Sequence, residues 1–223
     1  MVERTVSKEH GFFFRRIYED HESRYKFAAN FVKNKVVLDI ACGEGLGTAI
    51  LAHNAKSVIG VDIVEEVIKE ANEKYNPGKR GNIKFICANG MDWLRKNKIK
   101  FDSVVSYETV EHIKDYLLFL TLIKKHLKTD GLLILSTPNK EFSDFIMGGT
   151  FNPYHIKEFY VQELSEILQK VFGHKPQIFQ QRPVEKNHKL LSLIRNFLFS
   201  EKSLIVKENK QTIGLDTIYV VRK

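Results

Sequence analysis

Several features that define other classes of protein are scarce or missing in this 223-residue sequence. It has only two cysteines, Cys42 and Cys87, which excludes a disulfide-rich scaffold and suits the reduced thiols of the cytosol. Its longest strongly apolar run, residues 116–123, is too short to span a bilayer. The charged N-terminus has no apolar core of the kind that a signal peptide needs. We therefore expect a cytoplasmic protein.

Internal repeats and low-complexity segments are also missing. The hydrophobic share of 43% and the charged share of 28% are ordinary for a globular protein, and the length suffices for one α/β domain with a sizeable core. The formal net charge is +8, and residues 182–223 hold nine basic side chains against four acidic ones. Such an excess can attract nucleic acid, an anionic membrane or an acidic substrate, but an unspecialised lysine-rich surface explains it equally well.

What the sequence does contain is a glycine turn between a strand and a helix. Residues 35–40 form a short apolar run rich in β-branched side chains, which predicts a buried parallel strand. Gly43, Gly45 and Gly47 then alternate, and apolar residues at helical spacing begin at Leu46. Because glycine lets a ligand approach the bare backbone, the pattern predicts a nucleotide cradle. The alternative is a tight turn that binds nothing.

One acid and the glycine spacing narrow the choice of nucleotide. Dinucleotide folds use G-x-G-x-x-G, and a P-loop needs G-K-[ST], which does not follow here. Asp39, just before the turn, repels a pyrophosphate but suits an ammonium group. We therefore expect a nucleoside with a cationic tail, which describes S-adenosylmethionine (SAM). The stretch Asp39-x-x-x-Gly43-x-Gly45-x-Gly47 resembles motif I of the class I SAM-dependent methyltransferases.

A second acid follows at the end of the next predicted strand. Residues 57–62 are apolar up to Asp62, which lies about 20 residues after the first glycine, where a carboxylate reaches ribose hydroxyls. The alternative is that Asp62 caps the helix predicted at residues 64–75. The resemblance implies three further neighbours of the cofactor, namely Ala41, Glu44 and Ile63.

The third predicted strand, residues 83–87, ends in Ala88-Asn89-Gly90-Met91-Asp92. Related methyltransferases place an acid or amide here against adenine. Asn89 can accept from the adenine amine through its carbonyl oxygen and donate to a ring nitrogen, while Gly90 and Met91 pack against the base. Asp92 is the alternative partner of the amine.

One or two helices are predicted at residues 12–32, before the glycine turn. His21, Arg24 and Tyr25 share one helical face because they are three and four residues apart. Small-molecule methyltransferases carry a similar H-x-x-R-Y segment, which implies that Arg24 and Tyr25 help to cover the SAM site. The alternative is a polar outer face.

The remaining pattern predicts the rest of the sheet. Strands are expected at 101–106, 132–136, 177–181 and 212–221, and helices at 114–128 and 160–171. The fold class is therefore α/β, a doubly wound, mostly parallel, seven-stranded Rossmann-like sheet with an antiparallel closing hairpin. Residues 1–34 would form a helical cap over the SAM site, and residues 35–223 the methyltransferase domain.

Candidate catalytic residues follow the fourth and fifth strands. Glu108, Glu111 and His112 share one face of a helical turn, and His155 lies in the segment N-P-Y-H-x-K-E-F. In one interpretation His112 or His155 is a general base beside Glu108, because imidazole titrates near neutral pH. In a second, all four bind a divalent metal such as Mg²⁺. In a third, they are structural. Glu108 also lies where it can contact the cofactor.

Two resemblances bear on the methyl acceptor. E-x-x-E-H with a later histidine is similar to the metal site of methyltransferases that modify the terminal ribose of small RNAs, and quinone-modifying O-methyltransferases carry a similar motif. N-P-Y-H-x-K-E-F is similar to a segment of methyltransferases encoded with sugar enzymes. Residues 142–157 are long for a connection and suggest a substrate-covering loop. We expect O-methylation of a small sugar, glycolipid or quinone-like phenol, ahead of RNA and of a SAM-binding regulator.

Residues 186–210 exceed what a closing hairpin needs. Within them, residues 189–199 are apolar over most of a helical surface and carry basic flanks, so one small domain cannot easily hide them. We expect an insertion that forms a homodimer, contacts a membrane peripherally or borders the acceptor pocket. The alternative is an extra helix on the edge of the sheet of a monomer.

Overall fold

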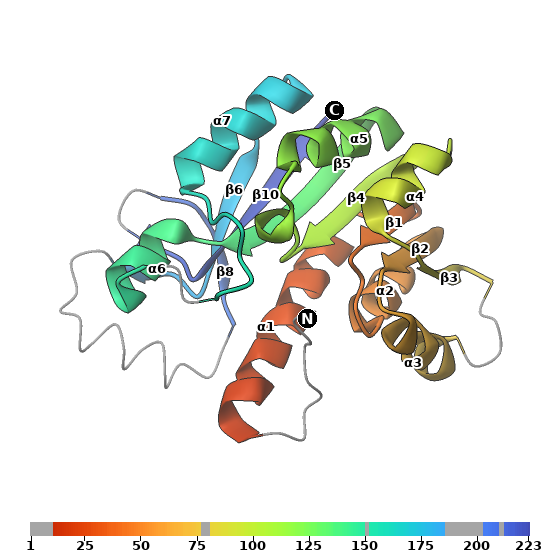
Figure 1. Cartoon of the computed structure of the whole chain (residues 1–223), viewed down its shortest axis with the longest axis horizontal. Coiled ribbons are helices and arrows are strands. Elements are labelled where there is room, and N and C mark those ends of the chain that lie inside the picture. Colours follow the sequence, from red (N-terminus) through yellow and green to blue (C-terminus); the bar gives the residue numbers. More distant parts are fainter. Residues whose placement is uncertain (1–10, 77–80, 150–151, 186–202, 210–211) are drawn as a thin grey trace.

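The computed structural model describes residues 11–76, 81–149, 152–185, 203–209 and 212–223. Its centre is an eight-stranded sheet in the order β3-β2-β1-β4-β5-β10-β6-β8, with helices on both faces (Figure 1). The five parallel strands are β1 (Val36–Ile40), β2 (Ser57–Asp62), β3 (Ile83–Cys87), β4 (Phe101–Tyr107) and β5 (Leu127–Pro138). The central strands β1, β4 and β5 are buried on both faces for most of their length, which explains the nearly continuous apolar runs from which they were predicted.

The antiparallel end of the sheet is larger than predicted. β10 (Asp216–Arg222) lies between β5 and β6 (Gln177–Gln181) and runs antiparallel to both, which confirms the closing pair. The expectation of seven strands was wrong, because β8 (Ile205–Lys207) pairs with β6 and adds an eighth. A separate two-stranded pair joins β7 (Val184–Glu185) to β9 (Thr212–Ile213).

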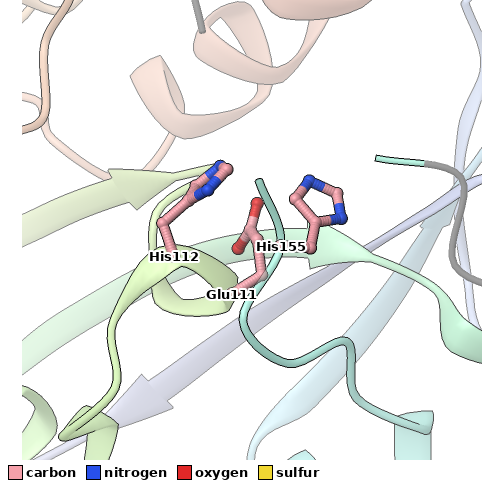
Figure 2. Close-up of side chains that lie close together, drawn as sticks. All are labelled: Glu111, His112 and His155. Carbon is pink, nitrogen blue, oxygen red and sulfur yellow. The ribbon is translucent and has the colours of Figure 1, made fainter. Parts of the chain in front are cut away.

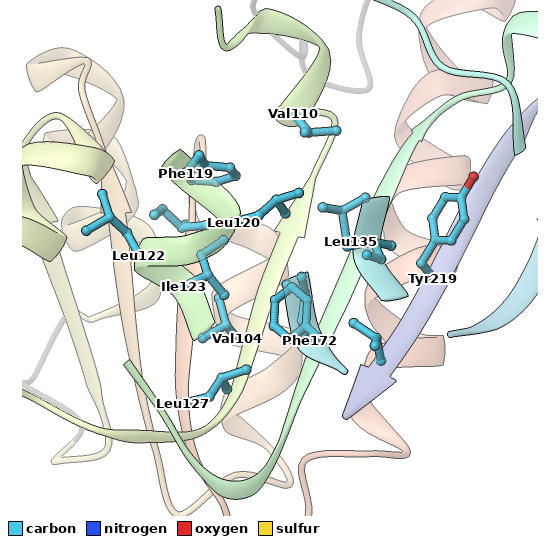
Figure 3. Close-up of a cluster of buried hydrophobic side chains, with 14 of the residues drawn as sticks. Val104, Val110, Phe119, Leu120, Leu122, Ile123, Leu127, Leu135, Phe172 and Tyr219 are labelled. Atoms are coloured by element: carbon cyan, nitrogen blue, oxygen red, sulfur yellow. The ribbon is translucent and has the colours of Figure 1, made fainter. Parts of the chain in front are cut away.

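The two faces of the sheet have separate hydrophobic cores. One face carries α1 (Gly11–Ala29), α2 (Leu46–Ala52) and α3 (Glu65–Tyr75), and the other carries α4 (Gly90–Lys96), α5 (Tyr116–His126) and α7 (Val161–Phe172). Figure 3 shows the second core, in which Phe119 and Ile123 of α5 and Phe172 of α7 pack on Val104, Leu135 and Tyr219 of the sheet. Helices therefore cover both faces of the strands, and the carboxyl edge stays available for function.

Local chemistry explains where several of these helices begin and end. Asp115 caps α5 by accepting from the backbone N–H of Leu118, and lysines occupy the last turn of that helix. Gly173 ends α7 in the left-handed conformation at φ 86°.

Two local predictions need correction, and one helix was not predicted. Residues 140–147 form helix α6 (Lys140–Met147), so only the later part of the segment 142–157 is a loop. Helix α4, which begins at Gly90 shortly after the third strand, was not predicted. β5 begins at Leu127, five residues before the predicted start of the fifth strand. Residues 128–131, with Asp130 at φ 59°, form a bulge opposite β4 within this strand.

Both cysteines are free thiols, as predicted. Among the described residues no helix combines the length and apolar character that crossing a bilayer requires. Residues 189–199, which carried the prediction of an apolar insertion, lie outside the described residues.

Candidate functional site at the carboxyl edge of the sheet

The order of the strands fixes where a ligand can bind. β1 and β4 are neighbours, and the chain winds away from them in opposite directions, toward β3 on one side and β5 on the other. A crevice forms outside the carboxyl ends of such a pair. Two residues beyond these ends have a positive φ that is unusual for side chains with a Cβ, Ala41 at 63° and Glu108 at 47°. Such strain is concentrated at functional sites.

The three motif glycines serve different purposes. A Cβ on Gly45 would lie 2.7 Å from the ring of Phe85, and one on Gly47 would lie 2.0 Å from the ring of Tyr25. Both are therefore required by packing. Gly43, at φ 52°, has no atom within 4 Å of the place of a Cβ, so its surface is the open side of the turn. This is the part of the cradle that a ligand can approach.

Asp39 is placed differently from the expectation. Its side chain is fully buried, and both oxygens accept internal hydrogen bonds, from Tyr25 Oη at 3.0 Å and from Thr48 Oγ1 at 2.6 Å. Burial raises the pKa of Asp39 to about 7, although the two hydrogen bonds oppose the shift. Because the side chain has no exposed surface, a ligand ammonium group contacts it directly only after a rearrangement of the residues that cover it. As it stands, Asp39 anchors α1 and α2 behind the turn.

Asp62 keeps both of the roles considered for it open. Oδ2 accepts from the N–H of Gly43 at 2.9 Å, and Oδ1 accepts from the N–H of Val64 at 3.0 Å, so the carboxylate ties the glycine turn to the start of α3. An ionised carboxylate offers about four acceptor positions, which leaves capacity for ribose hydroxyls. The next side chain, Ile63, is 57% exposed and offers an apolar surface beside it.

The end of the third strand is exposed beside this site. Asn89 is exposed and caps α4, because its side-chain oxygen accepts from the N–H of Asp92. The same oxygen was predicted to accept from adenine, so it would have to serve two donors. A Cβ on Gly90 would lie 2.9 Å from the side chain of Ile40, which explains this glycine by packing. Met91 is half-buried, and the side chain of Asp92 pairs with Arg95 at 2.7 Å.

Helix α1 lies against the inner side of the site. Tyr25 packs edge-on against Tyr107 at 5.0 Å between ring centroids. Arg24 is buried and donates to Gln181 and to Asp216 of β10, and it lies 3.9 Å from Glu108. Although burial opposes it, the negative charges of Glu108 and Asp216 raise the pKa of Arg24. Burial and the charge of Arg24 lower the pKa of His21. Arg24 and Tyr25 are buried, so the alternative of a polar outer face is wrong, and their covering of the SAM site stays a prediction.

Glu111, His112 and His155 come together beyond the fourth and fifth strands. One ligand atom of each lies within 4.8 Å of the others, and Figure 2 shows the Glu111 carboxylate between the two imidazoles. Glu111 and His112 belong to the short helix η1 (Val110–His112), and His155 to the loop before α7. Oε2 of the buried Glu111 accepts from Thr137 Oγ1, whereas Oε1 has no hydrogen-bond partner among the described residues.

That carboxylate is under electrostatic strain. Burial, and then the negative charge of Glu108, raise the pKa of Glu111 well above its usual range. A proton or a cation between Glu111 and the imidazoles relieves this cost. Two imidazole nitrogens and one carboxylate oxygen are a donor set that divalent ions accept.

Glu108 does not belong to this cluster, in contrast to the predicted set of four ligands. Its carboxylate accepts from Ser136 Oγ at 2.6 Å and faces Arg24. Because Glu108 precedes η1 with a positive φ, its side chain does not share a helical face with Glu111 and His112. It follows β4, the neighbour of β1 in the sheet, and comes two residues before η1.

The loop that carries His155 is seated on η1 by its backbone. The N–H groups of Ile156 and Lys157 both donate to the carbonyl oxygen of Glu111, at 2.8 and 3.0 Å. Nδ1 of His112 lies 3.1 Å from the carbonyl oxygen of Tyr154. Tyr154 and Ile156, the neighbours of His155 in the chain, are 46% and 59% exposed, whereas the 46% exposed Tyr160 donates through its hydroxyl to Asp144.

Sequence reasoning assigned no role to several polar residues that complete the site. Thr137 and Ser136 hold the two glutamates, Asp216 holds Arg24, and Glu158 holds His155 through a contact of 2.6 Å. Only Glu158 had a usable signal, because it follows His155 by three residues in the quoted segment.

Comparisons with known proteins agree with this architecture. The sequence model of a family described as "Methyltransferase domain" matches residues 31–195. A probable S-adenosylmethionine-dependent methyltransferase of Mycolicibacterium smegmatis is 30% identical over 75% of this chain and 62% of its own length. The mitochondrial ubiquinone biosynthesis O-methyltransferase of Rattus norvegicus is 33% identical over 52% of this chain and 34% of its own. The chain thus spans about half the length of the curated relatives it matches.

Solved structures show the same fold at low identity. The magnesium protoporphyrin IX methyltransferase of Synechocystis, with bound SAH, superposes with a TM-score of 0.68 at 15% identity, covering 98% of this chain and 90% of that one. The N-methyltransferase NodS of Bradyrhizobium japonicum, also with SAH, superposes with a TM-score of 0.59 at 14% identity, covering 96% and 89%.

Proposed function

We infer that the chain, which belongs to the class I SAM-dependent methyltransferases, transfers a methyl group to a hydroxyl of a small, quinone-like phenol. The observation that carries this proposal is the cluster of Glu111, His112 and His155 at the carboxyl edge. A phenolic hydroxyl needs its proton removed to attack the methyl group, and the cluster offers groups that can take that proton or stabilise the resulting anion.

The glycine turn fits SAM as the cofactor. Gly43 leaves its side of the turn open, Asp62 has acceptor capacity for ribose hydroxyls, and the exposed Ile63 offers an apolar contact for the base. When bound, SAM supplies an already activated methyl group. The protein therefore has to align the acceptor and manage one proton.

Two arrangements of the cluster of Glu111, His112 and His155 are compatible with the proposal. In the first, His155 accepts the hydroxyl proton directly. In the second, Glu111, His112 and His155 hold a divalent ion, which would stabilise the ionised hydroxyl as a Lewis acid. The unpartnered oxygen of the buried Glu111 favours the second, because a cation beside it offsets the cost of burying the charge.

Support for the acceptor class comes from two sides. The rat relative is named as an O-methyltransferase of ubiquinone biosynthesis. The exposed side chains of Tyr154 and Ile156, on either side of His155 in the chain, would give an aromatic acceptor an apolar surface to contact.

A methyl-transfer assay with purified protein tests the proposal. The protein is incubated with SAM and one acceptor at a time, namely a dihydroxybenzene, a hexose or a short RNA with a free terminal ribose. The products are identified by mass spectrometry. We expect methylation of the dihydroxybenzene. If only the RNA or only the sugar is methylated, that compound class replaces the phenol as the proposed acceptor. If the protein binds SAM but methylates none of the three compounds, the result favours a SAM-binding regulator.

The same assay distinguishes the two arrangements. Loss of activity in EDTA and recovery with Mg²⁺ or Mn²⁺ supports a metal, whereas full activity in EDTA leaves His155 as the base. His155→Ala should abolish activity in either case. His53→Ala removes an exposed imidazole at the end of α2 and serves as the matched control.

A further inference from the structure

The imidazole of His155 is held from behind by a buried carboxylate. Nδ1 of His155 lies 2.6 Å from Oε1 of Glu158, and the two side chains are 9% and 2% exposed. An ionised carboxylate only accepts hydrogen bonds, so the proton of this contact belongs to Nδ1. In a neutral imidazole the lone pair then lies on Nε2, the nitrogen that remains for the cluster with Glu111 and His112.

The loop does not need this contact for its position. Its backbone is already attached to η1 through Ile156, Lys157 and the Glu111 carbonyl oxygen. Meanwhile Oε2 of Glu158 is buried without a hydrogen-bond partner among the described residues, which is a cost to the folded state. What the carboxylate provides in return is the orientation of one ring.

The second imidazole of the cluster has the same arrangement. Nδ1 of His112 faces the carbonyl oxygen of Tyr154, which also only accepts hydrogen bonds. Residues 154–158 therefore supply an acceptor to the Nδ1 atom of each histidine. Both rings are directed to the cluster by one short segment of the chain.

We propose that Glu158 is a positioning residue, which fixes His155 in the Nδ1–H tautomer and presents Nε2 to the acceptor hydroxyl or its cation. The inference rests on the proposed function in so far as His155 takes part in methyl transfer. The buried carboxylate of Glu158 acts through His155 and not on the acceptor itself. Carboxylates behind ligating or catalytic histidines generally act in this way.

Nitrogen NMR of the histidine side chains tests the proposal without any acceptor. Protein labelled with ¹⁵N-histidine is treated with EDTA and recorded at a pH where the rings are neutral, and His155→Gln assigns the signal. We expect the Nδ1–H pattern in the wild type. Glu158→Ala should move His155 toward the Nε2–H form that free imidazole prefers, whereas Glu158→Gln, whose amide oxygen still accepts, should keep the wild-type pattern.

A matched control is available in the same region. Glu163→Ala removes a partly exposed carboxylate that pairs with Lys157 at 2.6 Å, and it should leave the His155 signal unchanged. An Nε2–H pattern in the wild type, or an unchanged pattern in Glu158→Ala, would overturn the proposal. If the alanine variant does not fold, an Nε2–H pattern in Glu158→Gln or in the wild type decides against it.

Kinetics add a second readout. Glu158→Ala should lower kcat about 10- to 100-fold, the usual effect of losing such a partner, with the affinity for SAM unchanged. An unchanged kcat beside a changed tautomer would remove the positioning role. If the wild type methylates no acceptor, the proposed function fails, while the tautomer experiment still stands or falls on its own.

Discussion

The two halves of the carboxyl edge are built in different ways. Around the glycine turn the geometry is set by close packing, since Gly45 touches Phe85 and Gly47 touches Tyr25. Around η1 it is set by buried polar groups, with Glu111 held by Thr137 and His155 held by Glu158. The first half is sensitive to added volume, and the second to a lost or altered charge.

Because the two halves are built differently, substitutions in them should affect stability and activity to different degrees. The packed half holds the core together and shapes the cofactor site at the same time, so damage there affects both. The polar half carries unpartnered buried oxygens on Glu111 and Glu158, which destabilise the fold and are retained for what they do. Substitutions in the two halves should therefore have opposite signatures.

The largest expected effect is in the polar half. Glu111→Gln keeps the shape of the side chain but removes its charge, so methyl transfer should fall about 10²- to 10⁴-fold. The free energy of unfolding should stay the same or rise, because an uncompensated buried charge is gone. Urea denaturation and initial rates measure the two quantities. A destabilised variant that is still active would assign Glu111 to the structure alone.

The next effect concerns the ion pair that joins the halves. Arg24→Met leaves Asp216 buried beside Glu108 without its cation, and we expect a loss of about 3–5 kcal/mol in the free energy of unfolding. Arg24→Met combined with Asp216→Asn should recover most of that loss, since the stranded charge is then removed. Equal losses in the single and double variants would show that packing, and not charge, is responsible.

A pair of glycine variants tests the packed half. Gly47→Ala places a methyl group into the Tyr25 ring and should cost about 1–3 kcal/mol of stability together with cofactor affinity. Gly43→Ala meets no atom and carries only the strain of its positive φ, about 1–2 kcal/mol. Calorimetric titration with SAM and urea denaturation of both variants provide the comparison. Wild-type stability in Gly47→Ala would contradict the packing argument.

The effect that is smallest per step of the experiment is a slope of the unfolding free energy with pH. The pKa of Asp39 is about 7 in the folded protein and about 4 in an unfolded chain, so the folded state binds the extra proton between these values. Its contribution to stability is complete below about pH 4 and is lost as the pH rises through 7, by at most about 1.4 kcal/mol per pH unit. Asp39→Asn should flatten the curve of unfolding free energy against pH in this window. If the curves of the wild type and of Asp39→Asn run parallel, the raised pKa of Asp39 is contradicted.

Prediction from sequence succeeded where the signal was local. The strands predicted at 83–87 and 177–181 coincide with β3 and β6, and the glycine turn, the second acid and the two histidine segments all lie at one edge of the sheet. Helix α6 was missed although its ends are marked, by the capping Asn139 and by Gly148 at φ 70°. There, length alone had suggested a loop.

Prediction failed where the partner is distant in the chain. Asp39 of β1 accepts a hydrogen bond from Tyr25, which reaches it from helix α1. Arg24 meets Asp216, 192 residues later, and no local pattern announces that pair. β8 is a strand only because β6 lies beside it, since three residues carry too little periodicity of their own.

The place of β10 has a consequence for the order of events during synthesis. It follows all other described strands in the chain, yet it lies inside the sheet, between β5 and β6. Until a ribosome has released residues 216–222, β5 is an open edge with unpaired backbone groups, and β6 has no neighbour that joins it to the parallel half. Asp216, which secures helix α1 through Arg24, arrives with that same strand. The nascent chain therefore closes its catalytic edge only after β10 has emerged.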